Sequence, residues 1–506
     1  MHIALLLFQL ATPGPAAPDP RAPLDRAVAT LGGPDRLARL DRWIVEGRGR
    51  ENLTAELQGR SPTAPTHRPH QDIVAVVRSL GRVAWERRTP RNDGSLRWRR
   101  FISGVDSSGF VDWTAGFGIL RSRPTSLAER AALMRRIPHL LLAELAAGPI
   151  AVESRPRRRG LEVIEVTLTD GVRLTLTFDR AHHLTAVEYP VAMPGAGPLT
   201  VRWSWPEWRA DADLRWVPVG HRLEVGGVLY QEVRYSQYRA ETDSAAALVH
   251  LPADPARFAA TPTTHPTFPS VAPAGSPAPG VHLLDIHGFR ALLVEFAEFV
   301  TLVEAPEQHP GLETIPASGA GNYGRVTLEL RRRLAELAPD KPLRYVVVTH
   351  HHDDHLGGLG GIAGPGTTVL VAPGHRRAAA RALAASPIPV GQSQGRPAVI
   401  ETVGRWRVIA DSVRRIEVFN VGDNPHTTEN LMVWLPAERI VFQGDLFYFD
   451  PDGHFPPSGR ETMTRFFARW LARQGIEPTA IYGVHYAGAA GPDAIRHAGR
   501  NPSPER

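Results

Sequence analysis

The sequence predicts an α/β layered domain in the C-terminal half and an α+β domain dominated by an antiparallel sheet in the N-terminal half. Before residue 260, apolar and polar residues alternate with the period of strands. After residue 280, apolar strands are interrupted by a helical stripe. Between them, residues 261–280 are rich in Pro, Ser, Thr, Ala and Gly, without a period that could build a core. We therefore expect a linker there.

The chain of 506 residues is too long for one ordinary hydrophobic core, so its length favours two or more domains. The change from strand periodicity to mixed strand and helix periodicity at the linker indicates where one domain ends and the next begins. We expect a signal peptide or disordered tail at 1–20, a β-rich accessory domain at 21–260, the linker at 261–280, the α/β domain at 281–490 and a tail at 491–506.

The first residues have the pattern of a secretory signal, because an apolar stretch from Ile3 to Leu10 is followed by small residues and prolines. Only Met1 and His2 precede it as a charged region, so a wrongly chosen start codon or a disordered tail are the alternatives. We expect export to the periplasm. The stretch is too short to span a bilayer and no other apolar run reaches about twenty residues, which predicts no stable membrane insertion.

Composition excludes several functional classes. The formal charge of +6 comes almost wholly from arginine, since Lys341 is the only lysine. The arginines are scattered, so they indicate a solvated surface and no nucleic-acid partner. The chain has no cysteine, which excludes disulfides, thiolate ligands, a cysteine nucleophile and a lipidated N-terminal cysteine. Any bound metal must therefore be held by histidine and carboxylate side chains.

In the N-terminal half, Leu161–Thr169 and Val172–Phe178 flank Asp170-Gly171, and the second segment alternates strictly between apolar and polar residues. Turn chemistry and period together predict a hairpin. Two helical stretches, Leu24–Leu40 and Leu127–Leu145, are expected to cover one side of the sheet.

In the C-terminal half, Ala291–Phe296 and Phe299–Val303 are predicted to be paired strands, and a helical stripe runs from Val326 to Leu337. Leu343–Val348 is predicted to be a buried strand. Directly after it, the sequence His350-His351-His352-Asp353-Asp354-His355 contains an H-x-H-x-D-H pattern, whose four named positions are metal-capable side chains within six residues. This spacing predicts a metal site.

Three more predicted strands end in metal-capable residues: Arg415–Val421, Ile440–Gln443 and Ala480–Val484. Together with the histidine cluster, they supply seven candidate ligands, namely His350, His352, Asp354, His355, His426, Asp445 and His485.

With these motifs in this order, residues from about 281 to 490 resemble the metallo-β-lactamase-fold hydrolase superfamily. The resemblance implies an αββα sandwich with the metals at one edge of the packed sheets. It also implies the ligands of the two metals: His350, His352 and His426 for the first, Asp354, His355 and His485 for the second, and Asp445 as a bridge between them.

Neutral imidazoles and carboxylates suit Zn²⁺, and two zinc ions per chain can share a water and supply hydroxide near neutral pH. We expect this bridging hydroxide to attack a small-molecule substrate that is ester-, lactone- or amide-like. Asp354 is the candidate catalytic residue, placed to orient the hydroxide and take up its proton. The alternatives are a phosphodiesterase, sulfatase or β-lactamase of the same superfamily, and a non-catalytic periplasmic carrier of a hydrophobic ligand.

Departures from family patterns narrow this choice. The lack of cysteine excludes the β-lactamase subclasses with a Cys ligand, and Asp445 disfavours the subclass without a bridging Asp. His352 stands where flavodiiron relatives carry Glu, which disfavours oxygen reduction. Only about twenty residues follow His485, so the helical substrate domain of glyoxalase II-like enzymes is not expected.

Several neighbouring residues receive weaker assignments. His351 and Asp353 are interpreted as bystanders or as groups that orient the ligands. His375 is expected at the surface, and Glu304, where many relatives have Asp, is interpreted as structural. The glycines of segment 357–361 are expected to let the backbone pass close to the site, because no phosphate-loop lysine follows them.

Two longer segments remain open. The aromatic segment after Asp445 either walls a substrate pocket, with Tyr448 or His454 as a polar contact, or packs in the core. The N-terminal half is similar to the curved sheet of lipoprotein-carrier and lipoprotein-sorting domains, a resemblance that implies an apolar cavity. It is interpreted either as a module that binds a lipid or another hydrophobic ligand, or as a scaffold or lid for the hydrolase domain.

Overall fold

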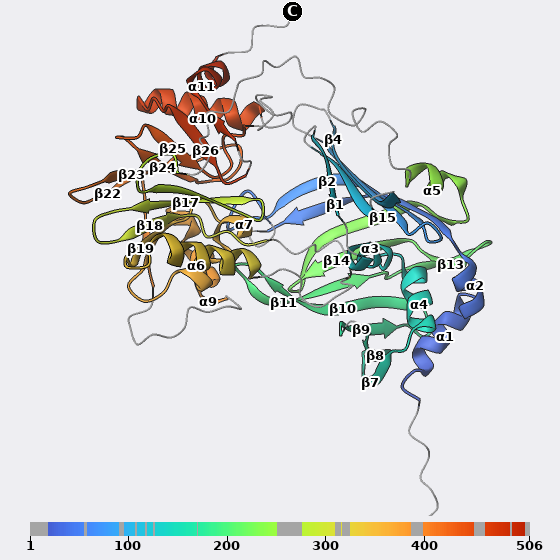
Figure 1. The fold of residues 1–506 in the computed structure, drawn as a ribbon. Helices are drawn as coiled ribbons and strands as arrows, with labels where there is room; N and C mark the ends of the chain where they lie inside the picture. Colours follow the sequence, from blue (N-terminus) through green and yellow to red (C-terminus); the bar gives the residue numbers. More distant parts are fainter. Residues whose placement is uncertain are drawn as a thin grey trace, which may run out of the picture.

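The computed structural model has one large antiparallel sheet in its N-terminal half and two smaller sheets in its C-terminal half (Figure 1). It describes residues 19–54, 58–90, 96–106, 109–116, 119–124, 127–169, 171–249, 276–308, 315, 324–385, 398–449, 461–485 and 488–500. Most of the expected signal segment and linker, with His454 and the last six residues, lie outside the described residues.

Thirteen strands form the N-terminal sheet, in the order β6-β5-β4-β3-β2-β1-β15-β14-β11-β10-β9-β8-β7, and all neighbours are antiparallel. Their bounds are β1 (Arg42–Leu53), β2 (Thr66–Val77), β3 (Arg82–Pro90), β4 (Leu96–Asp106), β5 (Gly109–Gly116), β6 (Ile119–Pro124), β7 (Ala151–Arg158), β8 (Leu161–Thr167), β9 (Arg173–Phe178), β10 (Leu184–Met193), β11 (Gly197–Ser204), β14 (Gly220–Val225) and β15 (Val228–Ala240). Strands β12 (Trp208–Asp211) and β13 (Arg215–Pro218) form a separate hairpin.

The predicted hairpin is confirmed, since β8 and β9 are paired antiparallel and Gly171 provides the turn with a φ of 82°. Leu174, Leu176 and Phe178 are fully buried, whereas Arg173 is exposed. The period-two pattern therefore places one face of this hairpin in the core.

Each predicted helical stretch forms two helices. The first divides into α1 (Ala22–Thr30) and α2 (Pro34–Arg39), because Gly32 and Gly33 have φ values of 105° and 90° that end the helix. The second divides into α3 (Leu127–Met134) and α4 (Pro138–Ala147), because Pro138 lacks the N–H that a continuous helix needs. A short helix, α5 (Asp243–Leu248), follows the last strand of this sheet.

Helix α4 packs against strands from both parts of the large sheet. Its Leu140 lies in one core cluster with Trp43 of β1, and its Leu141 lies in another with Phe178 of β9 and the fully buried Trp203 of β11. The sheet therefore bends around α4 (Figure 1). The side of the sheet that faces this helix is filled by the packed side chains of these two clusters.

The two C-terminal sheets have six strands each, in the orders β16-β17-β18-β19-β20-β21 and β22-β23-β24-β25-β26-β27. The strands are β16 (Val281–Ile286), β17 (Phe289–Glu295), β18 (Val300–Val303), β19 (Leu343–Val347), β20 (Thr368–Val371), β21 (Val399–Thr402), β22 (Trp406–Ala410), β23 (Arg415–Asn420), β24 (Leu431–Leu435), β25 (Ile440–Gln443), β26 (Ala480–Gly483) and β27 (Ala489–Ala490). The helices are α6 (Arg325–Leu337), α7 (Asp353–Leu356), α8 (Leu359–Ile362), η3 (Pro373–His375), α9 (Arg376–Ala384), α10 (Glu461–Gln474) and α11 (Pro492–Gly499). None of the described helices has both the length and the apolar character needed to cross a membrane.

The two C-terminal sheets pack face to face. Val303 and Val347 of the first sheet share a core with Val418 and Phe442 of the second. Helices α6, α8 and α9 cover the outer face of the first sheet, and α10 and α11 cover that of the second (Figure 1). The layered α/β arrangement expected for this half is therefore present.

The two halves are in contact. The turn between β10 and β11 lies against the C-terminal helices so closely that a Cβ added at Gly195 would be 2.8 Å from Cδ1 of Leu356. Likewise, a Cβ on Gly197 would be 3.4 Å from Cβ of Ala385, just after α9. Any role of the N-terminal half must therefore be considered together with the C-terminal half.

Candidate metal centre

Seven polar side chains meet at one edge of the facing C-terminal sheets. Four come from the end of β19 and from α7, and three come from the β23–β24 loop and the ends of β25 and β26. Because β25 and β26 are parallel, their carboxyl ends reach the same edge. The seven are the residues predicted from the sequence, namely His350, His352, Asp354, His355, His426, Asp445 and His485.

His350, His352 and His426 form the first group. Nε2 of His350 lies 3.0 Å from Nδ1 of His352 and 3.1 Å from Nε2 of His426. Each of these nitrogens presents a lone pair when the proton is on the other ring nitrogen. His350 and His352 are buried, whereas the His426 side chain is 16 % exposed, so the group opens to solvent beside His426.

Asp354, His355 and His485 form the second group, and Asp445 lies between the two groups. Oδ1 of Asp445 is 3.2 Å from Nε2 of His355 and 3.4 Å from Nε2 of His485. Oδ2 of Asp445 is 3.5 Å from Nε2 of His426 in the first group. Oδ2 of Asp354 is 3.4 Å from Nε2 of His485. Asp445 is thus the carboxylate that contacts both groups.

The two groups differ in charge. Burial lowers the pKa of His350 and His352 well below the usual value, and neighbouring imidazoles lower it further, so both are neutral. Burial acts in the same direction on His485, but Asp445 and Asp354 outweigh it and raise its pKa to about 9. Burial would raise the pKa of Asp445, yet His485 and His355 hold it well below the usual value.

These residues fit divalent metal ions. The first group offers neutral imidazoles, which is the form that binds metal. In the second group, Oδ1 of Asp354, Oδ1 of Asp445 and Nε2 of His355 are buried without a hydrogen bond among the described residues. Cations would satisfy these buried atoms, and nitrogen with carboxylate oxygen is a donor set that zinc prefers.

Two residues behind the ligands have contacts that the sequence did not predict. Oε2 of Glu304, interpreted as structural, lies 3.4 Å from Nδ1 of the buried His355. Oγ1 of Thr349 lies 3.0 Å from Nδ1 of His350. Such partners fix the ring orientation and the tautomer of a histidine ligand. In the sequence, only their positions could have indicated these contacts. Glu304 directly follows β18, which is paired with β19, and Thr349 directly precedes His350.

The structure corrects the expectation for His375. It was expected at the surface, but it is 1 % exposed and its ring centroid lies 4.8 Å from that of His351. Burial, followed by the neighbouring His351, lowers its pKa to about 3.

Tyr448 is also buried, and its hydroxyl donates a hydrogen bond of 2.9 Å to Oδ2 of Asp445. This tyrosine therefore supports a site residue.

His351 and Asp353 contact the N-terminal half. Nε2 of His351 donates to the carbonyl of Gly59 at 2.8 Å, and Oδ1 of Asp353 accepts from the Gln58 amide at 3.0 Å. The glycines after α7 allow the close backbone approach that was expected, since a Cβ on Gly357 would lie 2.4 Å from the Asp353 carbonyl oxygen.

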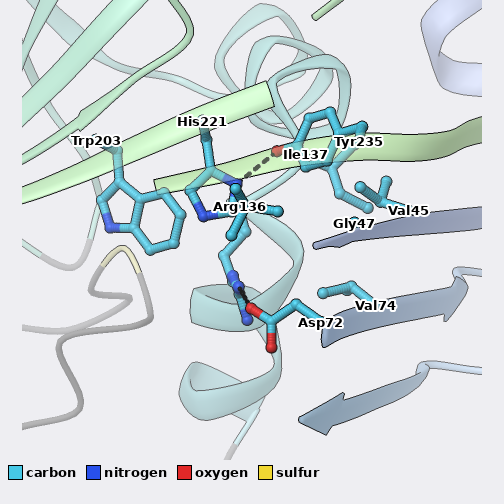
Figure 2. A pocket seen from close by; sticks show the side chains of 10 residues that line it. Val45, Gly47, Asp72, Val74, Arg136, Ile137, Trp203, His221 and Tyr235 are labelled. Atoms are coloured by element: carbon cyan, nitrogen blue, oxygen red, sulfur yellow. Dashed lines mark hydrogen bonds and ion pairs between the residues drawn. The ribbon is translucent and has the colours of Figure 1, made fainter. Parts of the chain in front are cut away.

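A second cluster of charged side chains lies within the N-terminal sheet. Asp72 accepts from Arg87 at 3.0 Å and from Arg136 at 3.0 Å, and Arg87 also contacts Glu51 at 3.2 Å. All four are buried, and two positive charges balance two negative ones. Figure 2 shows Arg136 pointing at Asp72, beside His221 and Tyr235.

The cavity at this cluster is small, with a volume of about 10 Å³. A cavity of about 10–15 Å³ holds roughly one water molecule. Nη1 of Arg136 and Nε2 of His221, two residues that line the cavity, are buried without hydrogen bonds among the described residues, and a water could satisfy them. The cluster is therefore a buried charge network without room for a substrate.

Residues 321–490 match a protein-family model described as the Metallo-beta-lactamase superfamily. Similar solved structures include a metallo-beta-lactamase from Pontibacter korlensis, with 20 % identity, 43 % of this chain and 91 % of that chain covered, and a TM-score of 0.29. FIM-1 from Pseudomonas aeruginosa, in its mono-zinc form, has 20 % identity, 46 % and 94 % coverage, and a TM-score of 0.30. A metallo-beta-lactamase from Erythrobacter litoralis has 22 % identity, 44 % and 91 % coverage, and a TM-score of 0.30.

The family match begins after the N-terminal half, so the resemblance of that half to lipoprotein-carrier domains stays a prediction. In the C-terminal half, the match spans β19 to β27 and includes all seven residues of the candidate centre. Residues 321–490 are therefore a domain of the metallo-beta-lactamase superfamily.

Proposed function

We propose that this protein is a zinc-dependent hydrolase that binds two zinc ions per chain. The observation that carries the proposal is the contact of Asp445 with both histidine groups, within a superfamily domain. The proposed ligands are His350, His352 and His426 for one ion and Asp354, His355 and His485 for the other, with Asp445 as the bridge. When bound, the ions would supply a water of lowered pKa and polarise the substrate oxygen.

Asp354 is the proposed catalytic residue. His355 and His485 outweigh the effect of burial and lower the pKa of Asp354 below its usual value, so the carboxylate is ionised near neutral pH. One oxygen, Oδ2, faces His485 at 3.4 Å, whereas Oδ1 forms no hydrogen bond among the described residues. With one carboxylate oxygen on the metal ion, the other would orient the attacking water and accept its proton.

The proposed substrate is a small ester-, lactone- or amide-like molecule. It would approach from the side where the centre is open, because the side chains of Asp354, His426 and His485 are 16 %, 16 % and 24 % exposed there. Such substrates share a carbonyl whose oxygen gains negative charge during attack by water. Cations and the imidazoles that hold them stabilise that charge.

The carrier alternative has less support. The face of the N-terminal sheet toward α4 is filled by packed side chains. Half of the residues that line a larger groove of about 490 Å³ are charged, and these do not suit a hydrophobic ligand: Arg48, Arg50, Glu207, Arg222, Glu232 and Arg234.

Metal analysis of the purified protein, together with a panel of chromogenic ester, lactone, phosphodiester, sulfate and cephalosporin substrates, tests the proposal. We expect two zinc ions per chain and turnover of the ester, lactone or amide-like substrates, both reduced in His352→Ala. His182→Asn is the matched control, since His182 is half-buried in the turn between β9 and β10 and Asn tolerates its φ of 67°. Less than one metal ion per wild-type chain, or unchanged turnover in His352→Ala, would contradict the proposal.

We also propose that the protein is exported to the periplasm, on the basis of its apolar segment from Ile3 to Leu10. Cell fractionation and N-terminal sequencing of the mature protein test this. A cytoplasmic protein that retains Met1 would contradict export.

A further inference from the structure

A short segment of the N-terminal half, Gln58–Arg60, lies directly against the metal centre. It follows β1 and is held by hydrogen bonds within the N-terminal half. Gly59 N donates to the carbonyl of Thr54 at 2.7 Å, and Arg60 N donates to Oγ1 of Thr66 at 3.1 Å. On its other side, it contacts both loops that carry the first histidine group. These contacts connect residues almost 300 positions apart in the chain.

The first contact is with the loop after β19. The Gly59 carbonyl accepts a hydrogen bond of 3.0 Å from Nε2 of His352 and one of 2.8 Å from Nε2 of His351. A proton on Nε2 leaves the lone pair of Nδ1 free, and Nδ1 of His352 is the atom that lies 3.0 Å from His350. The Gly59 carbonyl therefore selects the tautomer and the ring orientation in which His352 can bind a metal.

The second contact is with the loop that carries His426. The Arg60 guanidinium donates to Oδ1 of Asp423 at 2.7 Å and to the carbonyl of Asn424 at 2.8 Å. Asn424 in turn accepts from the backbone N–H of His426 at 2.9 Å. The Arg60 carbonyl also accepts from Thr428 N at 3.1 Å, so the loop is held on both sides of His426.

We propose that Gly59 and Arg60 are positioning residues of the first metal site, supplied by the N-terminal half. This inference rests on the proposed zinc function. It makes the N-terminal half a structural part of the metal centre, since one short segment aligns His352 and His426 with His350. Neither Gly59 nor Arg60 binds the metal itself, so both act through the histidines that they hold.

Substitution of Gly59 can test the carbonyl contact. A Cβ on Gly59 would lie 2.3 Å from the carbonyl oxygen of Leu53 and 2.8 Å from that of Thr54, so Gly59→Ala must shift this segment. Gly404→Ala is the matched control, because a Cβ there would meet nothing within 4 Å. Arg60→Ala removes the second contact without this steric conflict. Its control is Arg496→Ala, which breaks an exposed ion pair with Asp493 on α11.

The experiment measures zinc affinity of the full chain by competition with a chromophoric chelator, the visible spectrum of the Co²⁺-substituted protein and the melting temperature of the metal-free protein. In Gly59→Ala and Arg60→Ala, we expect one of the two zinc affinities, that of the first site, to fall by about 10–100-fold, with an altered Co²⁺ spectrum. Both control variants are expected to match the wild type.

The outcomes separate this inference from the proposed function. If the wild type binds two zinc ions and both variants keep its affinities and Co²⁺ spectrum, positioning by Gly59 and Arg60 is wrong and the hydrolase proposal stands. A lower melting temperature with unchanged zinc affinity also overturns the inference, because it shows a role in stability alone. If the wild type binds no zinc, the proposed function itself fails.

Discussion

Oε2 of Glu304 lies 3.4 Å from Nδ1 of His355, and both side chains are completely buried. The negative charge of this carboxylate lies beside one ring nitrogen, while Nε2 of the same ring faces Asp445, at 3.2 Å from its Oδ1. Carboxylate partners of this kind raise the basicity of a histidine ligand and fix its orientation. A residue interpreted from the sequence as structural thus lies beside a residue of the proposed second metal site.

Glu304→Gln should weaken binding of the second zinc ion. The amide keeps the size of the side chain but removes the charge beside His355, so we expect a loss of about 10–100-fold in affinity. Chelator competition measures it. Glu307→Gln is the control, because Glu307 is equally buried but bonds to Thr327. Equal zinc affinities in the two variants would contradict the role of Glu304.

Tyr448→Phe should reduce turnover more than stability. The substitution removes the hydrogen bond of 2.9 Å to Asp445 while the ring stays in place, so the bridging carboxylate loses one restraint. We expect kcat to fall by about tenfold, as a distorted catalytic geometry costs about 1.4 kcal/mol or more. Tyr482→Phe, at another buried tyrosine, is the control. A kcat equal to that of the control would refute this role.

Asp72→Asn should strongly destabilise the N-terminal half. Asp72 is the buried counter-ion of Arg87 and Arg136, and removal of one partner from a buried ion pair costs about 3–5 kcal/mol. Urea unfolding monitored by tryptophan fluorescence measures the loss. Asp493→Asn, in an exposed pair with Arg496, should cost less than about 1 kcal/mol. Similar losses in both variants would show that burial does not matter here.

Acid should destabilise the fold through buried histidines. Burial lowers the pKa of His139 to about 3. In the neutral ring, Nε2 donates a hydrogen bond to the Trp216 carbonyl and Nδ1 accepts one from the Tyr238 hydroxyl. The unfolded chain binds a proton near pH 6.5, so it gains protons that the folded chain does not. The free energy of unfolding should therefore fall as the pH falls from about 6.5 to about 3.

Between about pH 6.5 and pH 3, one such histidine should change the free energy of unfolding by about 1.4 kcal/mol per pH unit. Urea titrations between pH 7 and pH 4 measure it. In His139→Gln the slope should decrease by about that amount, because Gln has no proton to gain. His182→Asn, in the turn between β9 and β10, is the control variant. An unchanged slope in His139→Gln would contradict the prediction.

Local patterns predicted the elements that carry the site. Leu343–Val348 and Ile440–Gln443 are short, mostly apolar runs followed by polar residues, and both form strands at the expected places. Strand β25 is buried throughout, whereas β19 is buried only at Val346 and Val347. His375 was predicted wrongly, because Pro373-Gly374 indicates an exposed turn while packing against His351 buries the ring. Glycine and proline also divide each of the two predicted N-terminal helical stretches into two helices. The spacing of apolar residues alone does not predict such breaks.

By itself, the sequence determined the layered class of the C-terminal half and the seven side chains of the centre, because their residue types and strand-end positions are local properties. Only the tertiary structure decided that Gly59 meets His352, that Glu304 lies behind His355 and that Tyr448 holds Asp445. The Gly59 and Glu304 contacts join segments far apart in the chain, whereas that of Tyr448 depends on how its loop turns back toward Asp445. No spacing in the sequence encodes them, since each depends on how sheets, loops and the two halves pack.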